Sequence, residues 1–266
     1  MTSAEMGEPL VVTRHGTVAV LTIDRADKRN AMTAAMWAAL PGLLEDLAGD
    51  AGVRVLVVTG AGPGFCAGAD ISELLGGSDP DDPMADLRRH NLAAQAALRA
   101  FPKPTVAMIR GHCVGGGVEI AASCDLRFTD PTGVFGVTPA KVGIVYPPAS
   151  IRPLIDLVGP ATAKYLLLSG ELIDAEAALR SGLVDRLVAA DQLEAEVFRF
   201  AEVLASRSAL TQRSVKDIVA ALTDGRDDDA ESRAAVFYRE TIARGELAEG
   251  VAAFTERRPP SFGRAS

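Results

Sequence analysis

Three consecutive glycines, at positions 115–117, stand directly before the apolar run of residues 118–122. Glycine adopts backbone conformations with positive φ and lets a ligand approach its N–H group closely. The apolar run predicts a helix, so the glycines lie at its N-terminus. Unpaired N–H groups and the positive end of the helix dipole favour negative charge there. The segment therefore predicts a turn that opens a helix and can cradle an anion.

Glu119 lies one turn into this predicted helix, so its carboxylate can reach a group held at the helix N-terminus. Such a pair suits removal of a proton next to a carbonyl group, because the cradle stabilises the enolate that forms. Two plainer interpretations are open. The glycines could serve close packing of the helix, and Glu119 could be an exposed residue stabilised by the helix dipole. The pattern favours an enzyme that works through an enolate.

The composition is that of a globular protein: 266 residues, of which 48% are hydrophobic and 23% charged. A net charge of -8 argues against nonspecific binding to nucleic acid or to anionic membranes. The three cysteines, Cys66, Cys113 and Cys124, lack metal-ligand spacing, which predicts buried reduced thiols and no metal site. Because no run has transmembrane length and no secretion signal is evident, we expect a cytoplasmic protein without a membrane partner.

Strand and helix patterns alternate through the first two thirds of the chain, which favours an α/β fold. Strands are predicted at residues 10–13, 17–24, 53–58, 105–109 and 126–129. The first two form a hairpin, and Thr33 is the expected N-cap of the next helix. Helices dominate after residue 150, at 151–158, 161–168, 175–180, 193–206, 210–222 and 229–243. The expected division is a core over residues 1–200 and a helical C-terminal region over residues 201–266.

Short motifs recur in a fixed order at residues 29–32 (Arg-Asn-Ala-Met), 65–70 (Phe-Cys-Ala-Gly-Ala-Asp), 103–107 (Lys-Pro-Thr-Val-Ala), 115–119 (Gly-Gly-Gly-Val-Glu), 124–127 (Cys-Asp-Leu-Arg), 182–184 (Gly-Leu-Val) and 254–262 (Phe-Thr-Glu-Arg-Arg-Pro-Pro-Ser-Phe). In this order they resemble the crotonase superfamily, also called the enoyl-CoA hydratase/isomerase family. The resemblance covers nearly the whole chain. It implies a spiral of β-β-α turns forming two sheets, followed by a helical region that assembles a homotrimer or a dimer of trimers.

The resemblance also implies an acyl-CoA substrate whose thioester oxygen lies between two backbone N–H groups. In this chain they belong to Ala69 and Gly116, and Glu119 matches the first of two catalytic glutamates. Coenzyme A enters as part of the substrate, so no further cofactor is expected.

Two sets of residues match positions that contact coenzyme A. The first set contains Lys28, Arg29, Ala31, Ala67, Gly68, Asp70 and Ile71. The second contains Tyr238, Phe254 and Arg257, which the resemblance places in a pocket shared with a neighbouring subunit. Arginine is well suited to the CoA phosphate, although a charged residue near a C-terminus can also be merely solvated.

The chain departs from the family pattern after Phe135, where hydratases carry a second glutamate and this sequence has Pro139. Water addition with two carboxylates needs one to activate water and one to deliver a proton. The sequence therefore predicts an enzyme of the hydratase/isomerase type with a single glutamate acid/base.

Two other functions are open. Members that resemble methylmalonyl-CoA decarboxylase use a tyrosine at the position of Tyr146, although they carry histidine where this chain has Ala69. Tyr146 could equally pack beside the following prolines. A non-catalytic acyl-CoA-binding protein is the second alternative, whereas the glycine spacing excludes a Rossmann dinucleotide site. The helix at residues 86–100 and the loop at 145–151 should shape the acyl pocket, but neither carries a decisive residue.

Overall fold

Two β-sheets form the centre of the computed structural model, which describes residues 9–74, 79 and 81–262. The strand order is β1-β2-β3-β4-β6-β9 in the larger sheet and β5-β7-β8 in the smaller one. In the larger sheet β1 (Leu10–His15) runs antiparallel to β2, and the other neighbours are parallel: β2 (Val18–Ile23), β3 (Val55–Gly60), β4 (Thr105–Ile109), β6 (Leu126–Thr129) and β9 (Arg186–Leu187). The smaller sheet contains β5 (His112–Val114), β7 (Val134–Gly136) and β8 (Ile173–Asp174).

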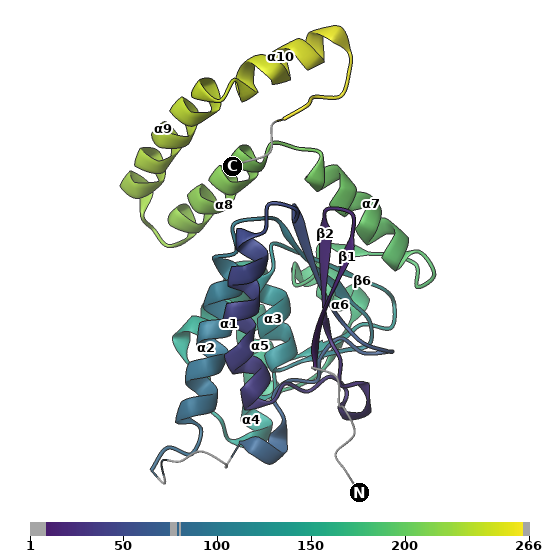
Figure 1. Ribbon diagram of the computed structural model, residues 1–266. Helices are drawn as coiled ribbons and strands as arrows, with labels where there is room; N and C mark the ends of the chain where they lie inside the picture. Colours follow the sequence, from purple (N-terminus) through teal and green to yellow (C-terminus); the bar gives the residue numbers. More distant parts are fainter. Residues whose placement is uncertain (1–8, 75–78, 80, 263–266) are drawn as a thin grey trace, which may run out of the picture.

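Helices cover both faces of the larger sheet (Figure 1). The first group is α1 (Ala34–Gly49), α2 (Ala85–Arg99), α3 (Gly116–Ser123), α4 (Pro139–Val142), α5 (Pro148–Ser169) and α6 (Ala175–Ser181). The C-terminal group is α7 (Leu193–Ala205), α8 (Ala209–Thr223), α9 (Asp227–Ala243) and α10 (Glu246–Glu256). The predicted α/β class is confirmed.

The pleat of β2 divides its side chains between two cores. Ala19 and Leu21 join the cluster that contains α1, α2, α3 and α5, whereas Val18 and Val20 join a second cluster under α7. Successive side chains of a strand point to opposite faces, so a strand that is covered on both faces is apolar throughout. This explains the continuous apolar runs that predicted the buried strands.

Local sequence signals account for several boundaries. The hydroxyl of Thr33 accepts a hydrogen bond from the Met36 N–H at 3.2 Å, as expected of an N-cap. The two helices predicted at 151–158 and 161–168 are the two arms of α5, which bends at Gly159, where φ is 72°. Pro160 follows and has no N–H to continue the helical hydrogen bonds.

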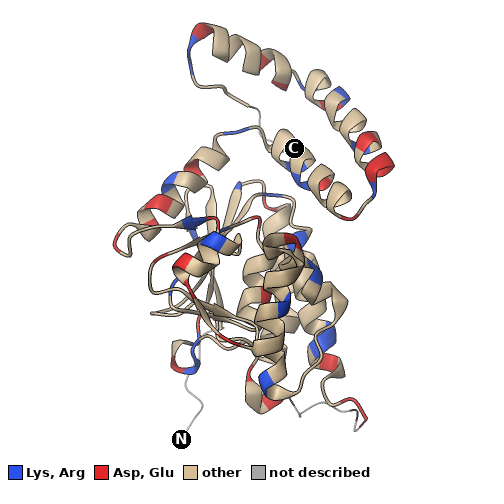
Figure 2. Ribbon diagram, turned by 180° about the vertical axis from the view of Figure 1, so that it is seen from behind, with Lys and Arg blue, Asp and Glu red and all other residues tan. Residues whose placement is uncertain are grey.

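Helices α8–α10, here called the C-terminal arm, extend beyond the two sheets (Figure 1). Lys216 on α8 attaches the arm to the core, since its Nζ lies 2.6 Å from Asp125 Oδ2 and 3.0 Å from the Lys103 carbonyl oxygen. Figure 2 shows acidic and basic positions interspersed along the arm. The arm begins after α7, whereas the predicted division at residue 200 falls inside α7, and that division stays a prediction. No helix in the described ranges is long and apolar enough to span a bilayer.

Candidate active site

The glycine segment forms the turn that the sequence predicts. β5 ends at Val114, Gly115 has φ 53° and ψ -117°, and α3 begins at Gly116. A β-carbon on Gly117 would lie 2.2 Å from the Cys66 carbonyl oxygen, and one on Gly116 would lie 2.9 Å from the Trp37 ring. Close packing therefore explains Gly117 fully, while the first two glycines also shape the start of the helix.

Replacing Gly117 by alanine is expected to destabilise the fold by about 1–3 kcal/mol, because the clash is with backbone that cannot rotate away. Urea unfolding measures the effect. Gly42→Ala in α1 is the matched control, since a β-carbon there meets nothing within 4 Å. The control should gain roughly 0.5–1 kcal/mol. Equal stability of Gly117→Ala and the wild type would contradict the packing role.

The two predicted CoA-contacting segments, near residues 28–31 and 67–71, lie side by side. Three backbone hydrogen bonds join them: Ala67 N to Arg29 O at 3.0 Å, Met32 N to Gly68 O at 2.8 Å and Asp70 N to Met32 O at 2.9 Å. A further bond from Val114 N to Cys66 O, at 2.9 Å, ties the second segment to β5. The fold thus holds the two segments together, and Gly68 lies against Gly115 and Gly116 at the start of the glycine helix.

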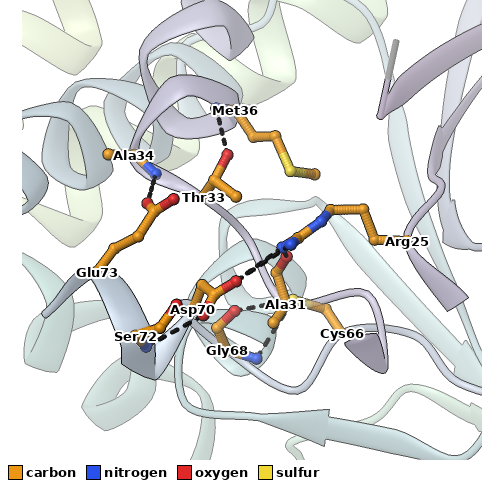
Figure 3. A network of polar contacts seen from close by, with 10 residues as sticks. All are labelled: Arg25, Ala31, Thr33, Ala34, Met36, Cys66, Gly68, Asp70, Ser72 and Glu73. Atoms are coloured by element: carbon orange, nitrogen blue, oxygen red, sulfur yellow. Dashed lines mark hydrogen bonds and ion pairs between the residues drawn. The ribbon is translucent and has the colours of Figure 1, made fainter. Parts of the chain in front are cut away.

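The carboxylate of Asp70 is engaged within the protein (Figure 3). Its Oδ2 lies 3.1 Å from Arg25 Nη2, and its Oδ1 accepts hydrogen bonds from the Ser72 hydroxyl at 2.7 Å and the Ser72 N–H at 3.1 Å. The Ser72 hydroxyl, with further help from Arg25, holds the pKa of Asp70 below its usual value. The side chain of Asp70 therefore braces this segment, and a CoA contact through its backbone stays a prediction.

The N–H groups of Ala69 and Gly116 lie close together at the start of α3. The position of a β-carbon on Gly116 is 3.4 Å from Ala69 N, and that of a β-carbon on Gly68 is 3.4 Å from Gly116 N. Within the described part of the chain, neither N–H has a hydrogen-bond partner. Buried backbone donors are rarely left unpaired, so this pair is suited to an oxygen supplied from outside.

Glu119 is buried, with 8% of its surface exposed, so the interpretation as an exposed helix residue is wrong. Its Oε2 accepts a hydrogen bond from Asn91 Nδ2 at 2.9 Å. Burial raises the pKa of Glu119, and side-chain hydrogen bonds with Asn91, Ser150 and Gln95, together with the positive charge of Arg99, oppose the rise. A carboxyl group with a raised pKa next to unpaired donors is suited to acid/base chemistry.

The sequence did not predict three residues that contact this carboxyl group. Asn91 and Gln95 lie on α2, and Ser150 lies at the start of α5, in the two regions expected to carry no decisive residue. Gln95 is 2% exposed and Ser150 6% exposed. A signal was available, since Asn91 and Gln95 are four residues apart on a helix whose apolar face includes Leu87 and Leu98.

Tyr146 lies over the glycine turn. Its hydroxyl oxygen is 3.5 Å from the position of a β-carbon on Gly115, and the ring packs on the main core. Burial, and to a lesser extent the charge of Glu119, raises the pKa of Tyr146. Pro139 is buried at the start of α4, and the stretch 136–150 contains no acidic residue. Tyr146 thus packs on the core, and its hydroxyl group lies next to the glycine turn.

Comparison with known proteins decides the family. A model of the enoyl-CoA hydratase/isomerase family matches residues 13–265. The chain belongs to the enoyl-CoA hydratase/isomerase family. The 2,3-dehydroadipyl-CoA hydratase of Escherichia coli strain K12 is 30% identical over 253 residues, which cover 95% of this chain and 98% of that protein.

Solved structures of the same family confirm the crotonase fold. An enoyl-CoA hydratase/carnithine racemase from Magnetospirillum magneticum superposes with a TM-score of 0.91 at 32% identity and 97% coverage of both chains. A further enoyl-CoA hydratase/isomerase family member superposes with a TM-score of 0.88 at 35% identity, covering 97% of this chain and 99% of its own.

The remaining three predicted CoA contacts of this family member lie on the C-terminal arm, away from the glycine helix (Figure 1). Tyr238 on α9 is 63% exposed and Phe254 on α10 is 88% exposed, and Arg257 caps α10 with φ 54°. Within one chain they are not brought to Glu119. The described residues contain no group of three or more His, Cys, Asp or Glu side chains that could hold a metal ion.

Proposed function

We propose that this chain is an acyl-CoA-processing enzyme in which the thioester oxygen accepts hydrogen bonds from the N–H groups of Ala69 and Gly116. One observation carries the proposal: two adjacent donors without partners in the described chain lie at the start of the helix that holds the buried Glu119. Negative charge that develops on a thioester enolate falls on that oxygen, and fixed amide dipoles stabilise it without reorganising.

Glu119 is the single acid/base group of the proposed reaction. It takes a proton from, or returns one to, a carbon of the acyl chain, and its raised pKa brings it closer to neutral pH, where such a group works best. With Pro139 in place of a second glutamate, the chain has no second carboxylate in this region to activate water in the usual hydratase manner. Coenzyme A belongs to the substrate, and the proposal requires no other cofactor.

The coenzyme A moiety would lie along the segments around residues 28–31 and 67–71, which the backbone hydrogen bonds hold next to the glycine helix. The arm residues Tyr238, Phe254 and Arg257 would complete this site in a neighbouring copy. A homotrimer or a dimer of trimers in the cytoplasm is the proposed form. The exposed apolar side chains of the arm, among them Val251 and Phe254, support a contact with another copy.

A panel of enoyl- and malonyl-type CoA thioesters tests the proposal. Turnover of at least one member by the wild type, together with its loss in Glu119→Gln, is the expected result. Binding in calorimetry without turnover of any member would instead support a non-catalytic acyl-CoA-binding protein. Absence of both binding and turnover would contradict the proposal altogether.

Decarboxylation of a malonyl-type thioester is a second candidate, favoured by the position of the Tyr146 hydroxyl beside Gly115 and by its electrostatic interaction with Glu119. The bond from the α-carbon to the carboxylate breaks, carbon dioxide leaves, and the electron pair moves onto the thioester oxygen. A proton then passes from Tyr146 or Glu119 to the α-carbon. No base for C–H cleavage is needed.

For this candidate, Tyr146→Phe is expected to slow carbon dioxide release by about a hundredfold, because the phenol no longer supplies the proton. Release is measured with malonyl-type CoA thioesters, and turnover of enoyl thioesters by the same variant serves as the internal control. Carbon dioxide release at the wild-type rate would remove Tyr146 from the chemistry and leave only its packing role.

A further inference from the structure

We propose that Gln95 is a positioning residue, which orients Asn91 and Ser150 so that both donate hydrogen bonds to Glu119. The inference rests on the proposed acid/base role of Glu119, and it goes beyond that role because Gln95 donates to both residues in addition to its own contact with the carboxyl group. Nε2 of Gln95 lies 2.7 Å from Asn91 Oδ1 and 2.9 Å from Ser150 Oγ. Both protons of this amide group are thereby committed.

Arg99, whose guanidinium can only donate hydrogen bonds, indicates the direction of the hydrogen bonds made by Gln95. Arg99 Nη1 lies 3.5 Å from Gln95 Oε1, and a guanidinium has no acceptor atom. The guanidinium of Arg99 therefore favours the amide oxygen of Gln95 on its side, with the amide nitrogen towards Asn91 and Ser150.

The hydrogen bonds from Gln95 set which atoms of Asn91 and Ser150 face the carboxylate of Glu119. Asn91 accepts a hydrogen bond from Gln95 at Oδ1, so its nitrogen is the atom that faces Glu119, at 2.9 Å from Oε2. Ser150 likewise accepts from Gln95 at its oxygen, which leaves its one proton for Glu119. Gln95 thus leaves the Asn91 amide nitrogen and the Ser150 hydroxyl proton as the donors available to Glu119.

Donors aimed at a buried carboxyl group stabilise its ionised form. Burial of Glu119 favours the protonated form, and the hydrogen bonds oppose this effect. Without Gln95, Asn91 could rotate its amide and Ser150 could turn its hydroxyl away. Glu119 would then hold its proton to higher pH, and less of it would be available as a base at neutral pH.

Three ionisable groups interact electrostatically with Glu119 in the described chain: Arg99 from α2, Tyr146 from the segment before α5, and Cys66 from the loop before α2. Burial raises the pKa of the Cys66 thiol to about 12 and also raises that of Tyr146. Burial lowers the pKa of Arg99 below its usual value, but the charges of Asp224 and Glu119 oppose this. The imidazole of His90, also on α2, absorbs outside the infrared carboxyl region, so it is not mistaken for Glu119.

The test titrates the infrared carboxyl band of Glu119 in the full-length protein, obtained as the difference between each variant and the same variant with Glu119→Gln. Gln95→Met removes both donated hydrogen bonds at similar volume. We expect the midpoint of the band to move to higher pH, and kcat/KM at neutral pH to fall by about tenfold or more, as for other groups that act through a neighbour. The acidic limb of the kcat/KM profile should move in the same direction as the band.

Gln212→Met is the matched control, because Gln212 on α8 donates to the Leu204 carbonyl oxygen, outside this network. An unchanged midpoint in Gln95→Met, or an equal shift in both variants, would overturn the inference. Ser150→Ala removes one of the two branches and keeps Gln95, so it separates positioning from the direct contact of Gln95 with Glu119. An unchanged midpoint in Ser150→Ala overturns the inference too, and this variant also decides the matter if Gln95→Met does not fold. A shifted band in a protein that turns over no acyl-CoA thioester would disprove the proposed function and leave the positioning role in place.

Discussion

Glu119→Gln is expected to lower kcat by about 10²–10⁴-fold while leaving the fold intact, because glutamine matches glutamate in shape but cannot exchange the proton. Because Glu119 is buried, the substitution should also change how the stability of the protein depends on pH. Burial raises the pKa of Glu119 above its unfolded value of about 4.5, so the folded state holds this proton more tightly than the unfolded state. Stability of the wild type therefore falls as pH rises from the unfolded value through the raised folded value.

The variant has no such group to ionise, so its stability relative to the wild type should increase over the same pH interval. Thermal unfolding at a series of pH values and steady-state turnover of the thioester panel measure the two effects. Lost activity with retained or increased stability at neutral pH is the predicted combination. If wild type and variant turned over every substrate equally, Glu119 would have no part in the chemistry.

Gly116→Ala is expected to reduce kcat by about 10²–10³-fold, the usual effect of losing one donor to a developing oxyanion. A β-carbon there would lie 2.9 Å from Cζ2 of Trp37, a ring that is fully buried and has little room to move. The same β-carbon would lie 3.4 Å from Ala69 N. Either the start of α3 or the Ala69 segment must shift, and the proposed pairing of the two N–H groups with one oxygen would then be lost.

Turnover and acyl-CoA affinity of Gly116→Ala should be compared with those of Gly42→Ala, which changes glycine to alanine in open space on α1. The comparison separates the loss of the cradle from a general effect of removing a glycine. A kcat close to that of the wild type in a folded Gly116→Ala protein would show that this N–H group does not stabilise the transition state. The proposed oxyanion site would then be wrong.

The elements with strong local signals were predictable from the sequence. The hairpin of β1 and β2, the cap at Thr33 and the start of α3 after the glycines all follow from residues within a few positions of one another. The family motifs made the whole fold predictable as well, because their order along the chain carries information that apolar periodicity lacks. Periodicity alone does not distinguish this architecture from other α/β folds.

The environment of Glu119 was not predictable in the same way. Whether its carboxylate is solvated or buried depends on α2 and α5. Asn91 on α2 lies 28 residues before Glu119 in the sequence, and α5 begins about thirty residues after it. Asn91, Gln95 and Ser150 carry no local pattern that identifies a site, and each is unremarkable in its own segment. The exposure of Tyr238 and Phe254 on the arm likewise emerged only from the packing of α8–α10.

The sequence by itself determined the class of fold, the glycine turn at the start of α3 and the position of its glutamate along that helix. These depend on backbone preferences and on neighbours a few residues away. Only the tertiary structure decided that Glu119 is buried, that Asn91 donates a hydrogen bond to it, and that Gln95 donates to both Asn91 and Ser150. The reason is physical: burial and hydrogen-bond direction are set by groups from separate helices, whose meeting is a property of the packed core.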